Sequence, residues 1–149
     1  AGRLEPSSGQ LTRPLHDRVR LLTQETSLPD PFGRGPQRTA IDAYTDLVGI
    51  DLAEHVPLST FGLIAGRDQN RPVQELSVGQ QRRLALAILL ADPPEVLLLD
   101  EPTNHLSLGL VTALEGALSG YPGTVVIASH DRWLRNRWEG LQLTLSTGN

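Results

Sequence analysis

Four short runs of hydrophobic residues predict the strands of a sheet. The first spans residues 19–22 (VRLL) and is followed by polar residues. The second and third, residues 96–99 (VLLL) and 124–129 (TVVIAS), do not alternate with polar positions, a pattern typical of strands that are buried on both faces. Residues 141–148 (LQLTLSTG) do alternate, which predicts a strand at the edge of a sheet.

Between the first two runs, apolar residues recur at the three- and four-residue spacing of amphipathic helices. Residues 38–50 place four of them on one face: Ile41, Tyr44, Leu47 and Val48. Residues 52–64 predict a second helix, which Pro57 and Gly62 bend or divide. The preceding segment 27–37 (SLPDPFGRGPQ) contains three prolines and two glycines and is predicted to be a loop.

Further helices are predicted toward the C-terminal end of the chain. The longest begins after Ser77 and is stopped by Asp-Pro-Pro at 92–94, another spans 108–118, and a short one lies within 130–138. Residues 39–74 form a small helical insert. Buried strands separated by helices indicate an α/β fold with a mostly parallel sheet, in which ligands bind at the carboxyl ends of the strands.

Composition bounds the possible functions. The 149 residues suffice for one domain with one hydrophobic core. Seventeen acidic and thirteen basic residues give a net charge of −4, and no basic run predicts direct contact with nucleic acid. The absence of cysteine excludes disulfides and cysteine-ligated metals. The longest apolar run, residues 84–91, is too short to cross a membrane, and no signal peptide is evident, so the expected location is the cytoplasm.

The start of the longest helix combines two signals. Ser77 lies three residues before Gln80, which is the spacing of a capping box and needs no ligand. The box does not explain Gly79, because glycine in a first helical turn costs about 0.8–1 kcal/mol relative to alanine. A glycine fits there if an anion approaches the exposed N–H groups of the helix start. A structural cap and an anion site both remain open for these residues.

Two acidic residues end the second predicted strand. Asp100 and Glu101 emerge at its carboxyl end, and Pro102 is expected to hold Glu101 in an extended conformation. Adjacent acids suit a division of labour, in which the first lies near a magnesium ion and the second accepts a proton from water. The alternative is that the pair caps the helix that follows.

Histidine and glutamine follow two other strands. His130 comes after the strand at 124–129 and is predicted to point to the same edge of the sheet, while Gln24 follows the first strand. Neither residue is informative alone. The remaining candidates are expected to be structural, with the two tryptophans packing the short helix against the core: His16, His55, His105, Trp133 and Trp138.

These features occur in one order along the chain, and that order is distinctive. Because of these features and their order, the sequence resembles the ATP-binding cassette (ABC) ATPases over its whole length. "LSVGQ" (76–80) resembles the family signature, and "VLLLDEP" (96–102) resembles the Walker B strand with its catalytic glutamate. "SHD" (129–131) resembles the switch-histidine loop, and Gln24 the Q-loop glutamine. The helical insert lies where this family places its helical subdomain.

"TNH" (103–105) resembles the ABC-F class in particular, whose members are soluble pairs of cassettes. Many of them act on the ribosome as translation factors or as protection proteins against antibiotics. The segment "LSVGQQRRLALA" is most similar to actinobacterial antibiotic-resistance members of the macrolide type. The resemblance implies an ATPase with a second cassette in the same chain and the ribosome as a possible partner. Two alternatives remain open: the nucleotide-binding subunit of a membrane exporter, with a membrane subunit as partner, and a decayed, non-catalytic cassette that acts as an interaction module.

The resemblance also implies roles for the residues that match the motifs. Asp100 would hold the water shell of Mg²⁺, Glu101 would be the general base, His130 would contact the γ-phosphate of ATP, and Gln24 would reach the metal or the attacking water. Three signature residues would bind the ATP held by the opposite cassette: Ser77, Gly79 and Gln80. Hydrolysis would then depend on closure of a pair of cassettes.

Three departures from the family pattern are visible. Val78 stands where the signature commonly has glycine, and Ser107 where the D-loop usually has aspartate. The chain also lacks a phosphate-binding loop of the G-x-x-x-x-G-K-[ST] type, and all thirteen basic residues are arginine. We therefore expect a piece of the C-terminal cassette, without the Walker A strand and loop, that is inactive alone. The strand at 124–129 would be left with an unpaired edge.

The expected division of this partial nucleotide-binding domain follows the motifs. Residues 39–91 would form the helical and signature subdomain. Residues 1–38 and 92–149 would form the remaining parts of the catalytic core.

Overall fold

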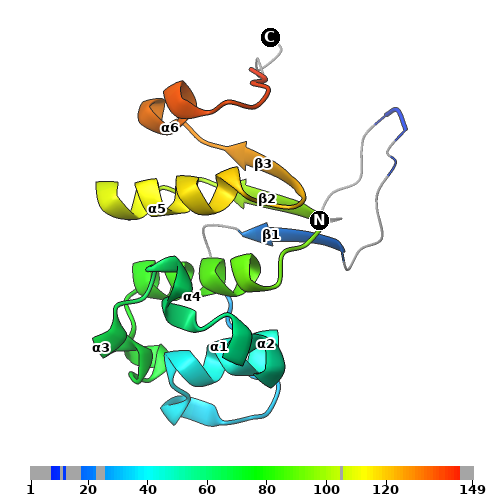
Figure 1. Cartoon of the computed structure of the whole chain (residues 1–149). Coiled ribbons are helices and arrows are strands. Elements are labelled where there is room, and N and C mark those ends of the chain that lie inside the picture. The colour runs from blue at the N-terminus through cyan, green and yellow to red at the C-terminus, as the bar shows by residue number, and fades with distance from the viewer. Residues whose placement is uncertain (1–7, 11, 13–17, 23–25, 105, 145–149) are drawn as a thin grey trace.

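The computed structural model describes residues 8–10, 12, 18–22, 26–104 and 106–144. Three parallel strands form its sheet, in the order β1 (Val19–Leu22), β2 (Val96–Asp100) and β3 (Thr124–Ala128) (Figure 1). In the register, Leu22 pairs with Leu99, and Asp100 pairs with Ala128. The predicted α/β fold with a parallel sheet is confirmed, and the carboxyl ends of β2 and β3 lie at one edge.

Helices pack against this sheet and form the insert beside it. The α-helices are α1 (Ala40–Val48), α2 (Ile50–His55), α3 (Gly66–Gln69), α4 (Val78–Ala91), α5 (Leu108–Ser119) and α6 (Arg132–Arg137). Short 3-10 helices are η2 (Gly35–Gln37), η3 (Leu58–Phe61) and η4 (Val73–Glu75). Figure 1 shows α4 beside β1, between the sheet and the group α1 to α3, with α6 beyond β3. Helix α4 therefore connects the helical insert to the sheet.

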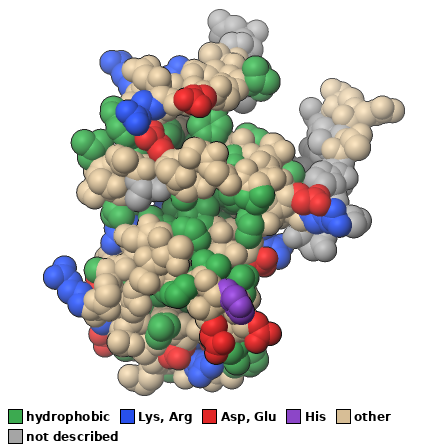
Figure 2. Space-filling model, in the orientation of Figure 1, with side chains coloured by type: hydrophobic (Ala, Val, Ile, Leu, Met, Phe, Trp, Pro, Cys, Tyr) green, Lys and Arg blue, Asp and Glu red, His purple; other side chains and the backbone are tan. Residues whose placement is uncertain are grey.

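The hydrophobic core runs from the sheet through α4 into the insert. Leu97 of β2 and Leu84 of α4 are both 0% exposed, as are Ala40 and Ala43 of α1. These residues belong to one cluster that reaches from β1 to α5. Figure 2 shows hydrophobic side chains gathered across the middle of one face, between the sheet above and the helices below. A single core thus joins the two parts.

The insert differs in detail from the predicted helices. Residues 38–50 do not form one helix, because Gly49 at φ 90° ends α1 and precedes α2. The buried face of α1 carries Ala40, Ala43 and Tyr44, whereas Ile41 is 40% exposed. The prediction for Ile41 was wrong, because the small alanines, rather than the isoleucine, allow the close approach of neighbouring helices. The predicted division of 52–64 is confirmed, since Pro57 and the left-handed Gly62 bound the short helix η3.

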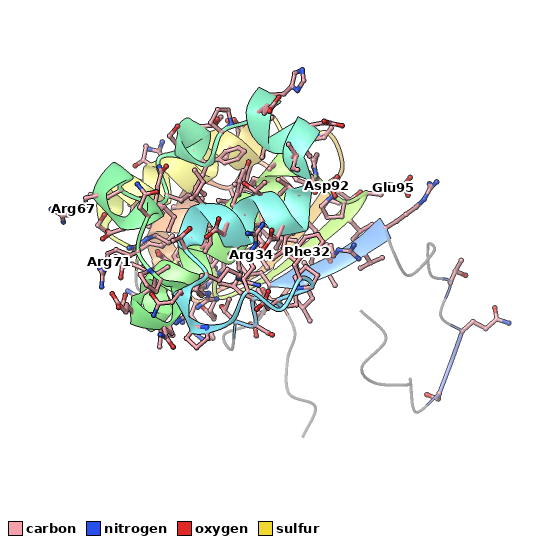
Figure 3. The ribbon with its side chains drawn as sticks, turned by 90° about the horizontal axis from the view of Figure 1, so that it is seen from below. Phe32, Arg34, Arg67, Arg71, Asp92 and Glu95 are labelled. Atoms are coloured by element: carbon pink, nitrogen blue, oxygen red, sulfur yellow. The ribbon has the colours of Figure 1, made fainter. Side chains whose placement is uncertain are left out.

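Acidic side chains order the loop before α1. Asp30 accepts hydrogen bonds from Arg34 N at 3.1 Å and Gly35 N at 2.9 Å, and Arg38 lies 3.3 Å away. The backbone hydrogen bonds from Gly35 and Arg34, with the side-chain contact of Arg38, hold the pKa of the Asp30 carboxyl below its usual value. Arg34 binds the Asp46 carboxylate with both Nε and Nη2, and its guanidinium lies 6.0 Å from the ring centre of Phe32 (Figure 3).

Two strand predictions are corrected. The strands at 96–99 and 124–129 were expected to be buried on both faces, but β2 is fully buried on one face only, and Val126 of β3 is 53% exposed. The apolar run of β3 therefore reflects the high strand propensity of valine and isoleucine and not complete burial. Residues 141–144 form no strand, and Leu141 and Leu143 are 98% and 90% exposed. Residues 145–148 lie outside the described part of the chain.

The structural role predicted for the tryptophans is also corrected. Trp133 and Trp138 are half-buried and do not belong to the core cluster, while Leu134 is the buried residue of α6 at 3% exposure. Trp133 instead stacks under Arg137, whose guanidinium carbon lies 4.7 Å from the ring centre. His55 is exposed and contacts Asp51 O at 2.6 Å, in line with its expected structural role. His16 and His105 lie outside the described residues.

Candidate functional site

The parallel register brings two chain segments together at the carboxyl edge of the sheet. Asp100 is paired with Ala128, so Glu101 and Ser129 follow at the same level. Glu101 N donates to Ala128 O at 2.8 Å, which extends the ladder by one more bond. The sequence predicted that Asp100, Glu101 and His130 share this edge, and the structure places them there.

Glu101 lies at the centre of this edge and is only 5% exposed. Its Oε1 accepts a hydrogen bond from His130 N at 3.1 Å and lies 2.9 Å from His130 Nε2. Its Oε2 accepts a longer bond from Ser129 Oγ at 3.3 Å. These polar donors orient the carboxylate, and no arginine side chain among the described residues forms an ion pair with it.

The backbone of Glu101 departs from the prediction. Proline at 102 was expected to hold Glu101 extended, yet its φ is 48°. The left-handed region is costly for a non-glycine residue, by about 1–3 kcal/mol, and it persists only where surrounding contacts determine the conformation. Here those contacts are the bond to Ala128, the side-chain bonds to Ser129 and His130, and the turn in which Asn104 N donates to Glu101 O at 3.2 Å. Tertiary contacts therefore override the local preference that Pro102 imposes.

Asp100 is half-buried beside Glu101 and makes no side-chain hydrogen bond within the described residues. The alternative that the two acids cap the next helix is excluded for the described structure, because the N-cap of α5 is Ser107. A carboxylate oxygen of this kind fits Mg²⁺, which prefers oxygen ligands and usually keeps several waters. No group of three or more His, Cys, Asp or Glu side chains that could hold a metal occurs in the described part of the chain. A hydrated Mg²⁺ that is held by one carboxylate and by phosphate oxygens does not need such a group.

The signature segment forms the predicted capping box at the start of α4. Gln80 N donates to Ser77 Oγ at 3.2 Å, and Ser77 N donates to Gln80 Oε1 at 2.9 Å. Ser77 is exposed and Gly79 half-buried, whereas Val78 points outward with 67% exposure. The structural role of Ser77 and Gln80 is thereby confirmed, and the start of the helix is open on its outer side.

A second layer of polar residues holds the Gln80 amide. Gln80 Nε2 donates to Asp68 Oδ2 at 2.9 Å, and Asp68 is 8% exposed. Arg71 Nη1 donates to Asp68 Oδ1 at 3.1 Å, and its Nη2 donates to Glu75 O at 2.9 Å (Figure 3). Both ends of the Gln80 amide are therefore bonded within this chain, which the sequence did not predict.

Arg82 is the residue of this region that sequence reasoning missed. It lies on α4, two positions after Gln80, and is 4% exposed. Its Nη2 donates to the carbonyl oxygens of Asp100 and Glu101, the latter at 2.8 Å. Burial lowers the pKa of the Arg82 guanidinium, and the negative charges of Asp100 and Glu101 oppose that shift. The only signal in the sequence was an arginine on the apolar side of an otherwise buried helix.

The predicted site residues thus form two groups. Asp100, Glu101 and His130 meet at the sheet edge, and Ser77, Gly79 and Gln80 surround the start of α4. Gln24 lies outside the described residues. A small cavity lies at the opposite, amino ends of β1 and β2, where Asp92 and Glu95 are found (Figure 3). That cavity is separate from both groups.

Comparison with known protein families identifies the cassette. A family model described as "ABC transporter" matches residues 1–104. The chain belongs to the ABC transporter family. The resemblance carried by the signature and Walker B segments is confirmed, and these two segments lie within the matched residues.

The curated relatives of this ABC family chain include a protein named for the F class. The tylosin resistance ATP-binding protein TlrC of Streptomyces fradiae is 41% identical over 149 residues, 99% of this chain and 26% of TlrC. The energy-dependent translational throttle protein EttA of Mycobacterium tuberculosis is 38% identical over 123 residues, 72% of this chain and 22% of EttA. ABC transporter F family member 4 of Arabidopsis thaliana is 34% identical over 139 residues, 92% of this chain and 19% of that protein. The chain spans about a quarter of the length of these relatives or less.

A solved structure supports the cassette fold of this ABC family chain. The ATP-binding cassette MJ0796, in a dimeric post-hydrolysis state bound to ADP and Pi, aligns with a TM-score of 0.58 and 26% identity. The alignment covers 77% of this chain and 53% of that structure. The predicted fold class, an ABC cassette with a parallel sheet, is confirmed. Within the described residues, no helix is long and apolar enough to span a membrane.

Proposed function

We propose that this chain is part of an ATP-hydrolysing cassette of an ABC-F protein, in which Glu101 is the general base. The observation that carries the proposal is the buried Glu101 carboxylate at the carboxyl edge of a parallel sheet, beside Asp100 and oriented by His130 and Ser129. Ligands of α/β sheets bind at this edge. The aligned cassette bound to ADP and Pi supports nucleotide as the ligand.

Each residue of the sheet edge has a distinct task in this proposal. Asp100 would hold a hydrated Mg²⁺ at the ATP site through its carboxylate, which makes no side-chain hydrogen bond among the described residues. Glu101 accepts the proton of the attacking water at Oε2, the oxygen whose bond to Ser129 is the longer one at 3.3 Å. The exposed imidazole of His130 donates to the γ-phosphate, and Gln24 reaches the metal or the attacking water. When bound, Mg²⁺ supplies neutralisation of the phosphate charge and alignment of the phosphate oxygens.

The signature group serves a different nucleotide in this proposal. Ser77, Gly79 and Gln80 lie at an exposed helix start, where N–H groups and hydroxyls suit an anion. The ATP they contact is held by a second cassette, so that hydrolysis requires two cassettes face to face. The dimeric state of the aligned structure supports such a pairing.

The test uses the full protein that contains this chain. Glu101→Gln should abolish multiple turnovers and leave ATP retained in a closed pair of cassettes, because binding persists after loss of the base. The measurement is steady-state ATPase activity together with nucleotide retained after gel filtration. A Glu101→Gln protein that hydrolyses ATP at the wild-type rate would sink the proposal.

The 149-residue chain alone is proposed to bind ATP very weakly and not to hydrolyse it, since it has no lysine to complete a phosphate-binding loop. ATPase activity of the purified chain that Glu101→Gln abolishes would contradict this. The coding sequence before Ala1 is therefore the decisive observation. An intact phosphate loop there favours an active cassette, and its absence from the gene favours the decayed interaction module.

We propose the cellular role from the names of two relatives. A tylosin resistance protein and a translational throttle protein support antibiotic resistance or translation control, with the ribosome as partner and the cytoplasm as location. The competing proposal is a subunit of a membrane exporter. A second cassette and a charged helical linker upstream in the same gene, with co-sedimentation of the protein with ribosomes, would favour the ABC-F role. Co-purification with a membrane subunit would favour the exporter.

A further inference from the structure

Arg82 joins the two groups of the candidate site within one chain. It lies in the first turns of α4, whose N-terminus carries the signature residues. Its guanidinium Nη2 donates to the backbone oxygens of Asp100 and Glu101, which are 18 and 19 residues away in sequence. Through this one side chain, the signature helix is bonded directly to the turn that carries both acids.

The chemistry of this position does not suit a simple filling residue. Arg82 is 4% exposed, its Nε has no acceptor among the described residues, and no carboxylate within that part of the chain forms an ion pair with it. A buried charge without a direct ion pair is costly even with the charges of Asp100 and Glu101 nearby, and an apolar side chain of similar volume would often be neutral or stabilising there. The contacts that this buried guanidinium does make are its hydrogen bonds to two carbonyl groups.

Glu101 needs such a contact because of its backbone. Its φ of 48° is disfavoured for glutamate, so neighbouring groups must hold it. The carbonyl oxygen of Glu101 receives two bonds, one from Arg82 at 2.8 Å and one from Asn104 N at 3.2 Å. Without Arg82 only the longer turn bond remains, and the direction in which the carboxylate points is less well determined.

We infer that Arg82 is a positioning residue, which fixes the Glu101 backbone and so links the position of the signature helix to the aim of the base. The inference rests on the proposed role of Glu101 in hydrolysis. When the signature end of α4 engages the nucleotide of a second cassette, a shift of α4 moves Arg82 and with it the Glu101 turn. Reaction geometry is sensitive to such shifts, since a displacement of about 1 Å can cost about 100-fold in rate.

The experiment compares Arg82→Met with Arg83→Met in the full protein. Methionine keeps the unbranched, apolar stem but removes the donors. Arg83 is the matched control, because it lies next to Arg82 on the same helix but its Nε donates to Leu63 O in the insert, at 3.0 Å. Arg82→Met should lower kcat about 10- to 100-fold with the KM for ATP changed by less than about twofold, whereas Arg83→Met should keep kcat.

A second readout separates positioning from folding. The double variant Arg82→Met with Glu101→Gln should retain as much ATP after gel filtration as Glu101→Gln alone, because binding and closure do not need the aimed base. If Arg82→Met lowers kcat, raises the KM for ATP and reduces the retained nucleotide together, Arg82 is only structural and the inference is overturned. A kcat equal to that of the wild type overturns it as well.

Arg82→Lys decides the matter if the methionine variant does not fold. The shorter lysine keeps the charge but cannot reach both carbonyl groups as the guanidinium does. Its kcat should fall between those of the wild type and Arg82→Met, at unchanged KM, and a wild-type kcat would overturn the inference. If the wild-type protein itself does not hydrolyse ATP, or Glu101→Gln is fully active, the proposed function fails first and is recognised separately.

Discussion

His130 lies on the carboxylate of Glu101, with 2.9 Å between His130 Nε2 and Glu101 Oε1, although the histidine side chain is 93% exposed and that of Glu101 is 7% exposed. One partner is therefore fixed in the protein and the other is in contact with water. An exposed ring exchanges one hydrogen-bond partner for another at small net cost, because net hydrogen-bond energies are about 0.5–1.5 kcal/mol. The same imidazole can thus hold Glu101 and later turn to a phosphate oxygen.

His130→Ala should lower kcat without disturbing the fold. Loss of an exposed side chain changes stability by about 0.5 kcal/mol or less, while loss of a group that aims a base and contacts phosphate should cost about 10- to 100-fold in kcat. The measurement is ATPase activity of the full protein beside its thermal unfolding midpoint. His55→Ala, which removes another exposed histidine far from the sheet edge in sequence, is the control and should keep kcat. Equal activities of the two variants would contradict the role of His130.

The sequence predicted the elements of this site better than their contacts. Asp100, Glu101 and His130 follow strands, so a parallel sheet necessarily brings them to one edge. The capping box of Ser77 and Gln80 was also predictable, because it depends on residues three apart in a helix start. Both predictions succeeded because the positions of strand ends and of helix starts can be recognised from the local sequence.

What the sequence could not predict depends on contacts between distant segments. The left-handed φ of Glu101 runs against the preference that Pro102 imposes and is held by Ala128, Ser129 and Arg82. Residue type does not distinguish Arg82 from the neighbouring Arg83, yet Arg82 bonds to the Glu101 turn and Arg83 to Leu63 in the insert. The exposure of Val126 has the same origin, since burial of a strand depends on what packs against it.

Ser77→Ala should weaken the start of α4. The substitution removes the oxygen that accepts from Gln80 N, and loss of such an N-cap costs about 0.5–2 kcal/mol. Amide hydrogen exchange in the first turn of α4 should become faster in the full protein, with a lower unfolding midpoint. Ser77→Thr keeps the hydroxyl and should recover most of the protection. Identical exchange in Ser77→Ala and the wild type would show that the cap does not stabilise this helix.

Leu97→Ala should be among the most destabilising substitutions in the sheet. Leu97 is 0% exposed in the strand that pairs on both sides, and emptying such a site costs about 2–5 kcal/mol. Val126→Ala in β3 removes a residue that is 53% exposed and should cost less than about 1 kcal/mol. Denaturant unfolding of both variants gives the comparison. Equal losses would mean that β3 is covered in the full protein.

Tyr121 should make stability fall at alkaline pH. Its hydroxyl donates to Pro94 O at 2.7 Å, and burial, aided by the negative charge of Asp92, raises its pKa to about 12 from a model-compound value of 10.0. Above pH 10 the unfolded chain releases this proton while the folded chain keeps it, so the unfolded state binds fewer protons and the free energy of unfolding decreases between about pH 10 and 12. Tyr121→Phe cannot release a proton, so its unfolding midpoint should fall less steeply over that interval. Tyr44, whose pKa burial also raises, is present in both proteins and cancels. Parallel curves for Tyr121→Phe and the wild type would show that Tyr121 ionises equally well in the folded chain.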